Sequence, residues 1–213
     1  IAAAGGPHFG PPDDPPFARD LDVFLQLIGF ATGYIQSGAQ PRDTNHIPSC
    51  NAAYRRPAFE EAGAFRPGLY PGEDVDLDRR IRKLGHRIRF VPTARVLHHR
   101  PATPTAWHRM LRAYGESSAK NIRLHGPFRA IHWLPPLVVL DVLMSAALLV
   151  WPSVAAANLF LQGIGFALVS VRIGRSPLGP FKAVRLLTET VVHFSSGYWR
   201  GILCVGEGRK PQR

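Results

Sequence analysis

Two consecutive apolar segments in the last third of the chain constrain its fold more than any other feature. Residues 131–151 and 154–173 are 21 and 20 residues long, and each is long enough to cross a hydrocarbon core of about 30 Å as a helix. The link Trp151-Pro152-Ser153 is short enough for a hairpin. We therefore expect a transmembrane hairpin over residues 131–173, attached to a domain of ordinary composition.

The positive charge of the chain is concentrated just before this hairpin. The formal net charge is +11, and residues 79–130 contain 13 Lys and Arg against one acid, Glu116. Such a block can bind nucleic acid, but it runs directly into an apolar segment, which favours the anionic lipid of a cytoplasmic leaflet. We predict contact with a membrane and none with nucleic acid, because a nucleic-acid binder would need the apolar segments to form a soluble core.

Basic residues flank both ends of the hairpin and predict its orientation. They are Arg123 and Arg129 on one side and Arg172, Arg175 and Lys182 on the other. Because Lys and Arg accumulate in cytoplasmic loops, both ends of the hairpin are expected in the cytoplasm. The predicted localisation is the cytoplasmic (inner) membrane, with the soluble domain facing the cytoplasm.

Further helices are expected on each side of the hairpin. Residues 105–130 are basic and place apolar side chains at helical spacing, which predicts an interfacial helix lying among lipid headgroups. Its apolar positions are Trp107, Met110, Leu111 and Tyr114. Residues 174–213 carry an apolar stripe interrupted by charges, which predicts an amphipathic C-terminal helix and tail rather than a third span.

The first part of the chain mixes strand and helix signals. Residues 1–20 are rich in Gly and Pro and predict a strand end followed by an irregular loop. Residues 21–36 have apolar side chains at helical spacing and predict a helix. The run 46–54 predicts a short buried strand that leads into a helix near residues 56–62, closed by Gly63.

The clearest helix signal in the chain lies in residues 72–85. Acidic residues occupy the first turn and basic residues the later turns, an order that complements the helix dipole, and Gly85 supplies the C-terminal stop. Residues 87–91 then alternate like a strand with one buried face, and residues 94–98 predict a second extended piece. This part of the chain is therefore expected to be mixed α/β.

The acids at the start of that helix differ in what they imply. On a helix that begins near Glu73, Asp74 shares a face with Leu77 and Ile81, so its carboxylate is predicted to point inward. Acids at a helix N-terminus also offset the dipole, which accounts for Glu73 and Asp76 without an active site. An inward charge is costly unless it is partnered or useful. Both a structural and a functional interpretation of Asp74 stay open on spacing alone.

The order and spacing of these segments resemble the family 2 glycosyltransferases, which are inverting enzymes of the GT-A type. The opening Ala4-Gly5-Gly6-Pro7 looks like the segment that follows the donor-binding half in that family. The other matching positions are Asn51-Ala52-Ala53-Tyr54-Arg55-Arg56, Phe59, Gly63, Phe65, Glu73-Asp74-Val75-Asp76-Leu77, Arg80, Gly85, Phe90, Pro92, Ala94 and His98. The resemblance implies that residues 1–104 are the C-terminal part of a GT-A domain, followed by transmembrane and interfacial helices.

The resemblance also implies roles for single residues. In that family the Asp of the Glu-Asp motif is the catalytic base, which implies Asp74 as the base and Glu73 as its companion in the catalytic motif. Asn51 and Arg80 are implied to contact the acceptor or substrate. In some members a His 24 residues after the base binds a divalent metal, Mg or Mn, and His98 stands at that distance. The implied substrates are a nucleotide-sugar donor and a lipid-linked or cell-envelope glycan acceptor.

One part of the family pattern is missing. The donor-binding half, with an Asp-x-Asp motif that would hold most of the metal, is expected upstream of Ile1, so the chain is expected to be the middle of a longer protein. The Asp-x-Asp triplets at Asp20, Asp74 and Asp76 lie in predicted helices and look unlike that motif. A Gln-x-x-Arg-Trp motif is also absent, which favours single transfer over polymerisation. The alternative is a non-catalytic, membrane-anchored subunit or remnant that acts as a scaffold.

Overall fold

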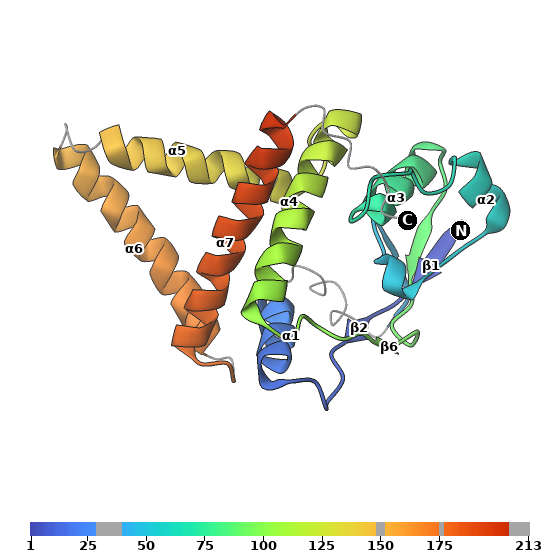
Figure 1. Ribbon diagram of the computed structural model, residues 1–213, viewed down its shortest axis with the longest axis horizontal. Helices are drawn as coiled ribbons and strands as arrows, with labels where there is room; N and C mark the ends of the chain where they lie inside the picture. Colours follow the sequence, from blue (N-terminus) through green and yellow to red (C-terminus); the bar gives the residue numbers. More distant parts are fainter. Residues whose placement is uncertain (29–39, 148–151, 175–176, 205–213) are drawn as a thin grey trace.

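The computed structural model describes residues 1–28, 40–147, 152–174 and 177–204. Figure 1 shows a small sheet with short helices at one end of the molecule and a group of long helices at the other. The mixed α/β character expected from the sequence is therefore confirmed for the first part of the chain.

A four-stranded sheet forms the centre of the α/β part. β1 (Ala3–Gly5) lies between β5 (Ile88–Phe90) and β4 (Ala52–Tyr54), and β3 (Arg42–Thr44) lies on the far side of β5. β1 runs parallel to β5 and antiparallel to β4. The alternation predicted for residues 87–91 is confirmed, because both ends of β5 are buried while its middle residue is partly exposed.

Two short helices complete the α/β part. α2 (Arg56–Glu61) and α3 (Glu73–Lys83) share a core with the sheet. The buried residues of this core are Ala2, Ala3, Ile47, Ala58, Ala62, Leu77, Ile81 and Ile88. The helix predicted over residues 72–85 is confirmed as α3, and Gly85 follows it with a positive φ of 85°.

The strand predicted over residues 46–54 is shorter than expected. Only its last three residues form β4, because a 3-10 turn, η1 (Ser49–Asn51), precedes it and pairs Asn51 N–H with Pro48 O at 3.0 Å. Beyond β5, a second ladder joins β2 (His8–Phe9) to β6 (Val96–Leu97) in parallel. The extended piece predicted over residues 94–98 is therefore confirmed.

Three helices form a second core. α1 (Pro16–Ile28), α4 (Pro104–His125) and α7 (Pro180–Leu203) bury Leu21, Phe24, Leu25, Trp107, Leu111, Leu178, Ala183 and Leu186. α4 and α7 lie side by side (Figure 1). A Cβ atom on Gly115 of α4 would lie 2.1 Å from Phe194 O, and one on Gly197 of α7 would lie 2.1 Å from Arg112 O. Glycine at both positions therefore lets the two backbones touch.

Several expectations need correction here. The loop expected up to residue 20 ends earlier, because α1 begins at Pro16, a residue tolerated in the first helical turn. Residues 29–36 of the predicted helix lie outside the described residues. The apolar stripe of α4 packs against α1 and α7 rather than lipid, and Trp107 and Leu111 are fully buried. Contact of another face of α4 with headgroups stays a prediction.

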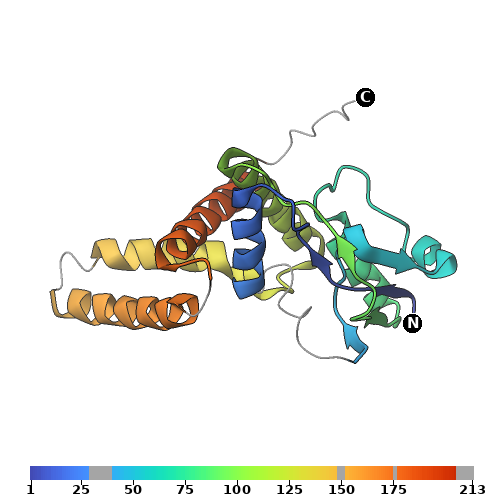
Figure 2. The ribbon, with the colours of Figure 1, turned by 90° about the horizontal axis from the view of Figure 1, so that it is seen from below.

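The remaining helices project away from the α/β part. η2 (Ala130–Trp133) leads into α5 (Leu134–Ala147), and α6 (Pro152–Gly174) returns toward α7 (Figures 1 and 2). Among the described residues, no single helix is both long enough and apolar enough to cross a membrane. One pair bent by 104°, Pro104–His125 with Ala130–Ala146, meets that test together. The hairpin over residues 131–173 stays a prediction, and the tail from Val205 lies outside the described residues.

Candidate active site

The first turn of α3 carries the two acids of the Glu-Asp motif. Gly72 precedes this turn with a φ of 95°, a conformation that glycine adopts far more readily than other residues. Asp74 is partly exposed. Its Oδ1 accepts a hydrogen bond from Val75 N–H at 2.8 Å, and its Oδ2 accepts one from Ser49 N–H at 3.0 Å. The carboxylate is therefore held by one donor from its own helix and one from η1.

Glu73 lies beside Asp74 in a less solvated place. Its Oε1 accepts a long hydrogen bond from Ser49 Oγ at 3.4 Å, and its Oε2 is buried with no hydrogen-bond partner among the described residues. Burial raises the pKa of Glu73, and the neighbouring charge of Asp74 adds to the effect. The two acids of the motif therefore differ, with Asp74 hydrogen-bonded by two backbone donors and Glu73 partly desolvated.

An open hollow of about 410 Å³ lies beside Ser49, and neither acid is among the residues that line it. One side is formed by η1 and the start of β4, and the other by the end of β1 and the chain that follows β5. Ser49 lines the hollow and also binds both acids. Of the residues predicted to contact substrate, Asn51 also lines it. The structure thus brings Asp74, Glu73 and Asn51 together at one edge of the sheet.

Asn51 also has a structural task. Its Nδ2 donates to Pro7 O at 3.0 Å and to Ala94 O at 2.7 Å. These bonds tie the segment after β1 to the segment after β5, so Asn51 holds the floor of the hollow in shape. Its contact with an acceptor stays a prediction.

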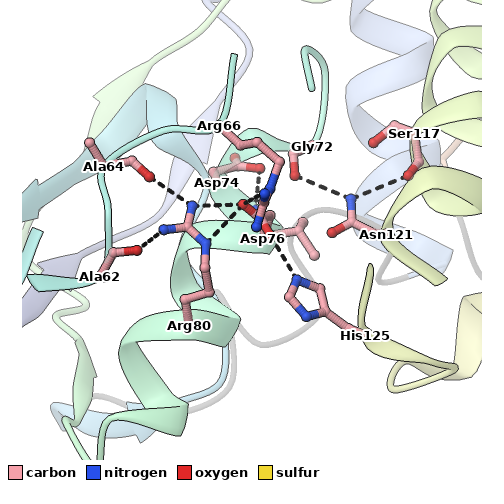
Figure 3. A network of polar contacts seen from close by, with 11 residues as sticks. Ala62, Ala64, Arg66, Gly72, Asp74, Asp76, Arg80, Ser117, Asn121 and His125 are labelled. Carbon is pink, nitrogen blue, oxygen red and sulfur yellow. Dashed lines mark hydrogen bonds and ion pairs between the residues drawn. The ribbon is translucent and has the colours of Figure 1, made fainter. Parts of the chain in front are cut away.

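Arg80 is occupied by the protein itself. Its guanidinium donates to the carbonyl oxygens of Ala62 and Ala64 and to Asp76 Oδ2, as Figure 3 shows. The bond to Ala64 O measures 2.7 Å and the shorter of the two bonds to Asp76 2.6 Å. The geometry therefore favours a structural role, in which Arg80 fastens the loop after α2 to α3, over the predicted contact with substrate.

Two acids of α3 that the sequence pattern did not single out are the most buried ones. Asp76 and Asp78 are both 0% exposed, whereas Asp74, which was predicted to point inward, is partly exposed. Asp78 accepts hydrogen bonds from Ile47 N–H at 2.9 Å and Tyr54 Oη–H at 2.9 Å and pairs with His46 Nδ1 at 2.8 Å. The assignment of Asp76 to the helix dipole alone is therefore wrong.

Asp76 is the centre of a charged network (Figure 3). Its Oδ2 pairs with Arg80 at 2.6 Å and with Arg66 at 3.5 Å, and its Oδ1 pairs with His125 Nε2 at 2.7 Å. Burial opposes ionisation, but the hydrogen bonds from Arg80 and His125 prevail and hold the pKa of Asp76 below its ordinary value. The spacing of Asp76 and Arg80, four residues apart on a helix, was a signal for part of this network.

Helix α4 closes one side of the site. Asn121 Nδ2 donates to Gly72 O at 3.3 Å and to Ser117 O at 3.2 Å, as Figure 3 shows. Tyr114, about two turns before Asn121, stands on the same face of α4. Burial raises the pKa of Tyr114 to about 12, and the charges of Asp74 and Glu73 contribute to the rise. The hydroxyl of Tyr114 therefore lies within electrostatic reach of both acids.

His98, the predicted metal ligand, is not among the residues that line the hollow. It follows β6, is exposed, and its Nδ1 lies 2.9 Å from His99 O, an arrangement in which Nδ1–H donates to this carbonyl oxygen and Nε2 is the other ring nitrogen. The described residues contain no group of three or more His, Cys, Asp or Glu that could hold a metal ion. Asp22, in one of the Asp-x-Asp triplets, is engaged by Arg100 Nε at 2.6 Å. His98 could therefore supply one ligand, but the described residues do not complete a metal site around it.

Comparisons with known proteins indicate the class of reaction but not the residues that perform it. The chain is similar to the succinoglycan biosynthesis protein ExoA of Rhizobium meliloti, with 28% identity over 206 residues that cover 87% of this chain and 62% of the relative. It is also similar to the pre-mycofactocin glycosyltransferase of Mycobacterium tuberculosis, with 32% identity over 88 residues that cover 41% of this chain and 19% of the relative. These relatives support a glycosyltransferase. The chain spans less than two thirds of the length of either relative.

No family model matches the chain, and no solved structure matches it. The support for glycosyl transfer therefore comes from the two kinds of relative, and the residues that would perform it come from the geometry of α3.

Proposed function

We propose that the protein is a family 2 glycosyltransferase of the GT-A type. It transfers a sugar with inversion, in single steps, from a nucleotide-sugar donor to a lipid-linked or cell-envelope glycan acceptor. The observation that carries the proposal is the carboxylate of Asp74, fixed at the N-terminus of α3 by Ser49 and Val75 beside an open hollow. The glycosyltransferase among the relatives supports the class of reaction.

Inverting transfer is a single displacement in which one carboxylate suffices. An acceptor hydroxyl attacks the anomeric carbon, its proton passes to Asp74, and the bond from that carbon to the nucleoside diphosphate breaks on the opposite face. The helix N-terminus places the positive end of the helix dipole beside this carboxylate. Each oxygen of Asp74 already accepts one hydrogen bond and has a second lone pair for the acceptor hydroxyl. Asp74 is thus a base that needs no rearrangement before it takes a proton.

A divalent metal, Mg or Mn, belongs to the same proposal. Such an ion would neutralise the charge of the departing diphosphate. His98 Nε2 fits as one of its ligands, because Nδ1 is engaged with His99 O. The other ligands would come from the donor-binding segment that the family pattern places before this chain.

The proposal places the site against the cytoplasmic face of a membrane. α5 and α6 expose apolar side chains such as Leu143 and Phe160, which are 62% and 69% exposed. Polar residues of these helices bond to one another instead: Gln162 Nε2 donates to Asp141 Oδ1 at 3.0 Å, and Asn158 Nδ2 donates to Ser145 Oγ at 3.3 Å. Apolar outer faces with polar contacts between helices are typical of segments surrounded by lipid.

The decisive experiment is the substitution Asp74→Asn in the protein expressed from its complete coding sequence. The amide oxygen still accepts from Val75 N–H, while the bond from Ser49 N–H and the proton acceptor are lost. One such hydrogen bond contributes about 1 kcal/mol, so the fold should persist. A positioned base contributes about 10²–10⁴-fold, and the transfer rate should fall by at least about 100-fold while donor affinity changes little. Glu73→Gln should cost less, because its side chain points about 100° away around the helix.

Asp43→Asn is the matched control for Asp74→Asn. Asp43 lies on β3, where its exposed carboxylate pairs with Arg89 Nε at 3.1 Å. The same chemical change there should leave the transfer rate close to wild type. Sugar transfer and donor affinity are measured in parallel on each purified variant. An Asp74→Asn protein within a few-fold of wild type would remove Asp74 as the base, and with it the proposed mechanism.

A further inference from the structure

Helix α4 contacts an acid of α3 through a buried side chain, His125. Its Nε2 lies 2.7 Å from Oδ1 of Asp76, and the side chains are 5% and 0% exposed. The other oxygen, Oδ2, is taken by Arg80 and Arg66. Among the described residues, His125 is therefore the one hydrogen-bond partner of Oδ1.

A second set of contacts keeps the imidazole of His125 in place. The ring of Phe128 meets the His125 ring edge-on, with 5.7 Å between centroids. The guanidinium of Arg79, on α3, lies 4.9 Å from the centroid of the same Phe128 ring. The last residue of α4, His125, and Phe128 just after it therefore both contact α3, at Asp76 and at Arg79.

These contacts bracket Asp74 along the chain. Asn121 of α4 binds Gly72 O, two residues before Asp74, and His125 binds Asp76, two residues after it. Asp76 N–H also closes the first helical turn onto Gly72 O at 3.2 Å. α4 therefore holds both ends of the turn that carries Asp74, as Figure 3 shows.

We propose that His125 is a positioning residue for transfer: by binding Asp76 it fixes the first turn of α3 and holds Asp74 in line with the acceptor hydroxyl. The inference rests on the proposed role of Asp74 as the base. In this proposal α4, which is followed by η2 and α5, takes part in orienting the base. A displacement of about 1 Å at a reacting group can cost about 100-fold in rate, so a loosened turn suffices to slow transfer.

The test compares three substitutions at His125 in the protein expressed from its complete coding sequence. In His125→Ala no donor remains for Oδ1 of Asp76, and kcat should fall by about 10-fold or more while the KM for the donor stays within about twofold. His125→Gln has an N–H donor on a side chain of similar reach and should restore kcat to within about threefold of wild type. His125→Asn is too short to reach and should behave like His125→Ala.

His108→Ala is the matched control. His108 lies on the same helix and pairs with a carboxylate, Glu189 of α7, at 3.1 Å, but on the face turned away from α3. This variant should keep wild-type kcat. A general loosening of α4 would instead lower kcat in both the His108 and the His125 variants.

Three results would overturn the inference: wild-type kcat in His125→Ala, equal impairment of His125→Gln and His125→Ala, or an equal loss in His108→Ala. If His125→Ala does not fold, the comparison of His125→Gln with His125→Asn decides, and equal kcat values would reject the inference. The proposed function fails separately, through an Asp74→Asn protein that still transfers sugar at the wild-type rate.

Discussion

The close approach of α4 makes Gly72, the residue before α3, sensitive to substitution. Its φ of 95° is strained for any residue with a Cβ atom, and a Cβ built there would lie 1.9 Å from Ser117 Oγ. The left-handed conformation costs about 1–2 kcal/mol for an L residue. Overpacking of this kind costs about 1–3 kcal/mol more. Gly72→Ala should therefore lower the free energy of unfolding by about 2–5 kcal/mol.

Two comparisons separate these contributions. Gly85 has a φ of 85° with no atom within 4 Å of a built Cβ, so Gly85→Ala should lose only the conformational part, about 1–2 kcal/mol. Ser117→Ala removes Oγ and leaves the Cβ of residue 117 at 3.2 Å. The double variant Gly72→Ala, Ser117→Ala should therefore recover most of the steric part, a coupling of about 1–3 kcal/mol.

Urea unfolding of the purified variants in one detergent, followed by tryptophan fluorescence, measures these differences. A loss for Gly72→Ala no larger than that for Gly85→Ala would show that α4 does not press on Gly72. Additive effects of the Gly72 and Ser117 substitutions would refute the steric explanation.

Two further predictions concern charge and topology. Burial raises the pKa of Glu73 above its ordinary value of 4.5, so the folded state binds this proton more tightly, and wild type loses stability as the pH rises from about 4.5 through the folded pKa. Glu73→Gln should therefore gain stability relative to wild type between pH 4 and pH 7 in urea unfolding, and an unchanged difference would contradict the burial of Glu73. A cysteine introduced at Ser153 should be labelled from the side of the membrane opposite the cytoplasm; labelling from the cytoplasm alone would exclude the hairpin.

Local chemistry explains the parts of the fold that could be predicted. α3 was located because its acids, its basic residues and Gly85 all lie within the helix or just after it. β5 was located because alternation is a property of neighbouring residues. The 3-10 turn at η1 was missed, because Ser49 N–H is drawn to Asp74, 25 residues away, and no local pattern records that bond.

The packing of α4 against α1 and α7 was not predicted, for a related reason. Its apolar stripe is compatible with lipid or with protein, and the sequence does not say which of the two meets Trp107. The answer depends on α7, where Gly197 allows the backbones to touch at a position more than 80 residues further along the chain.

The sequence by itself determined that four acids stand in the first half of one helix, three of them in its first turn, since helix formation and dipole compensation act over a few residues. Only the tertiary structure decided what each acid does. Asp76 is buried because Arg66 and His125 converge on it from a loop and from α4, and Asp78 because β4 brings Tyr54 to it. Asp74 remains partly exposed, and its partners are two backbone N–H groups, those of Ser49 and Val75. Burial of a charge depends on partners from distant segments, and helical periodicity carries no information about them.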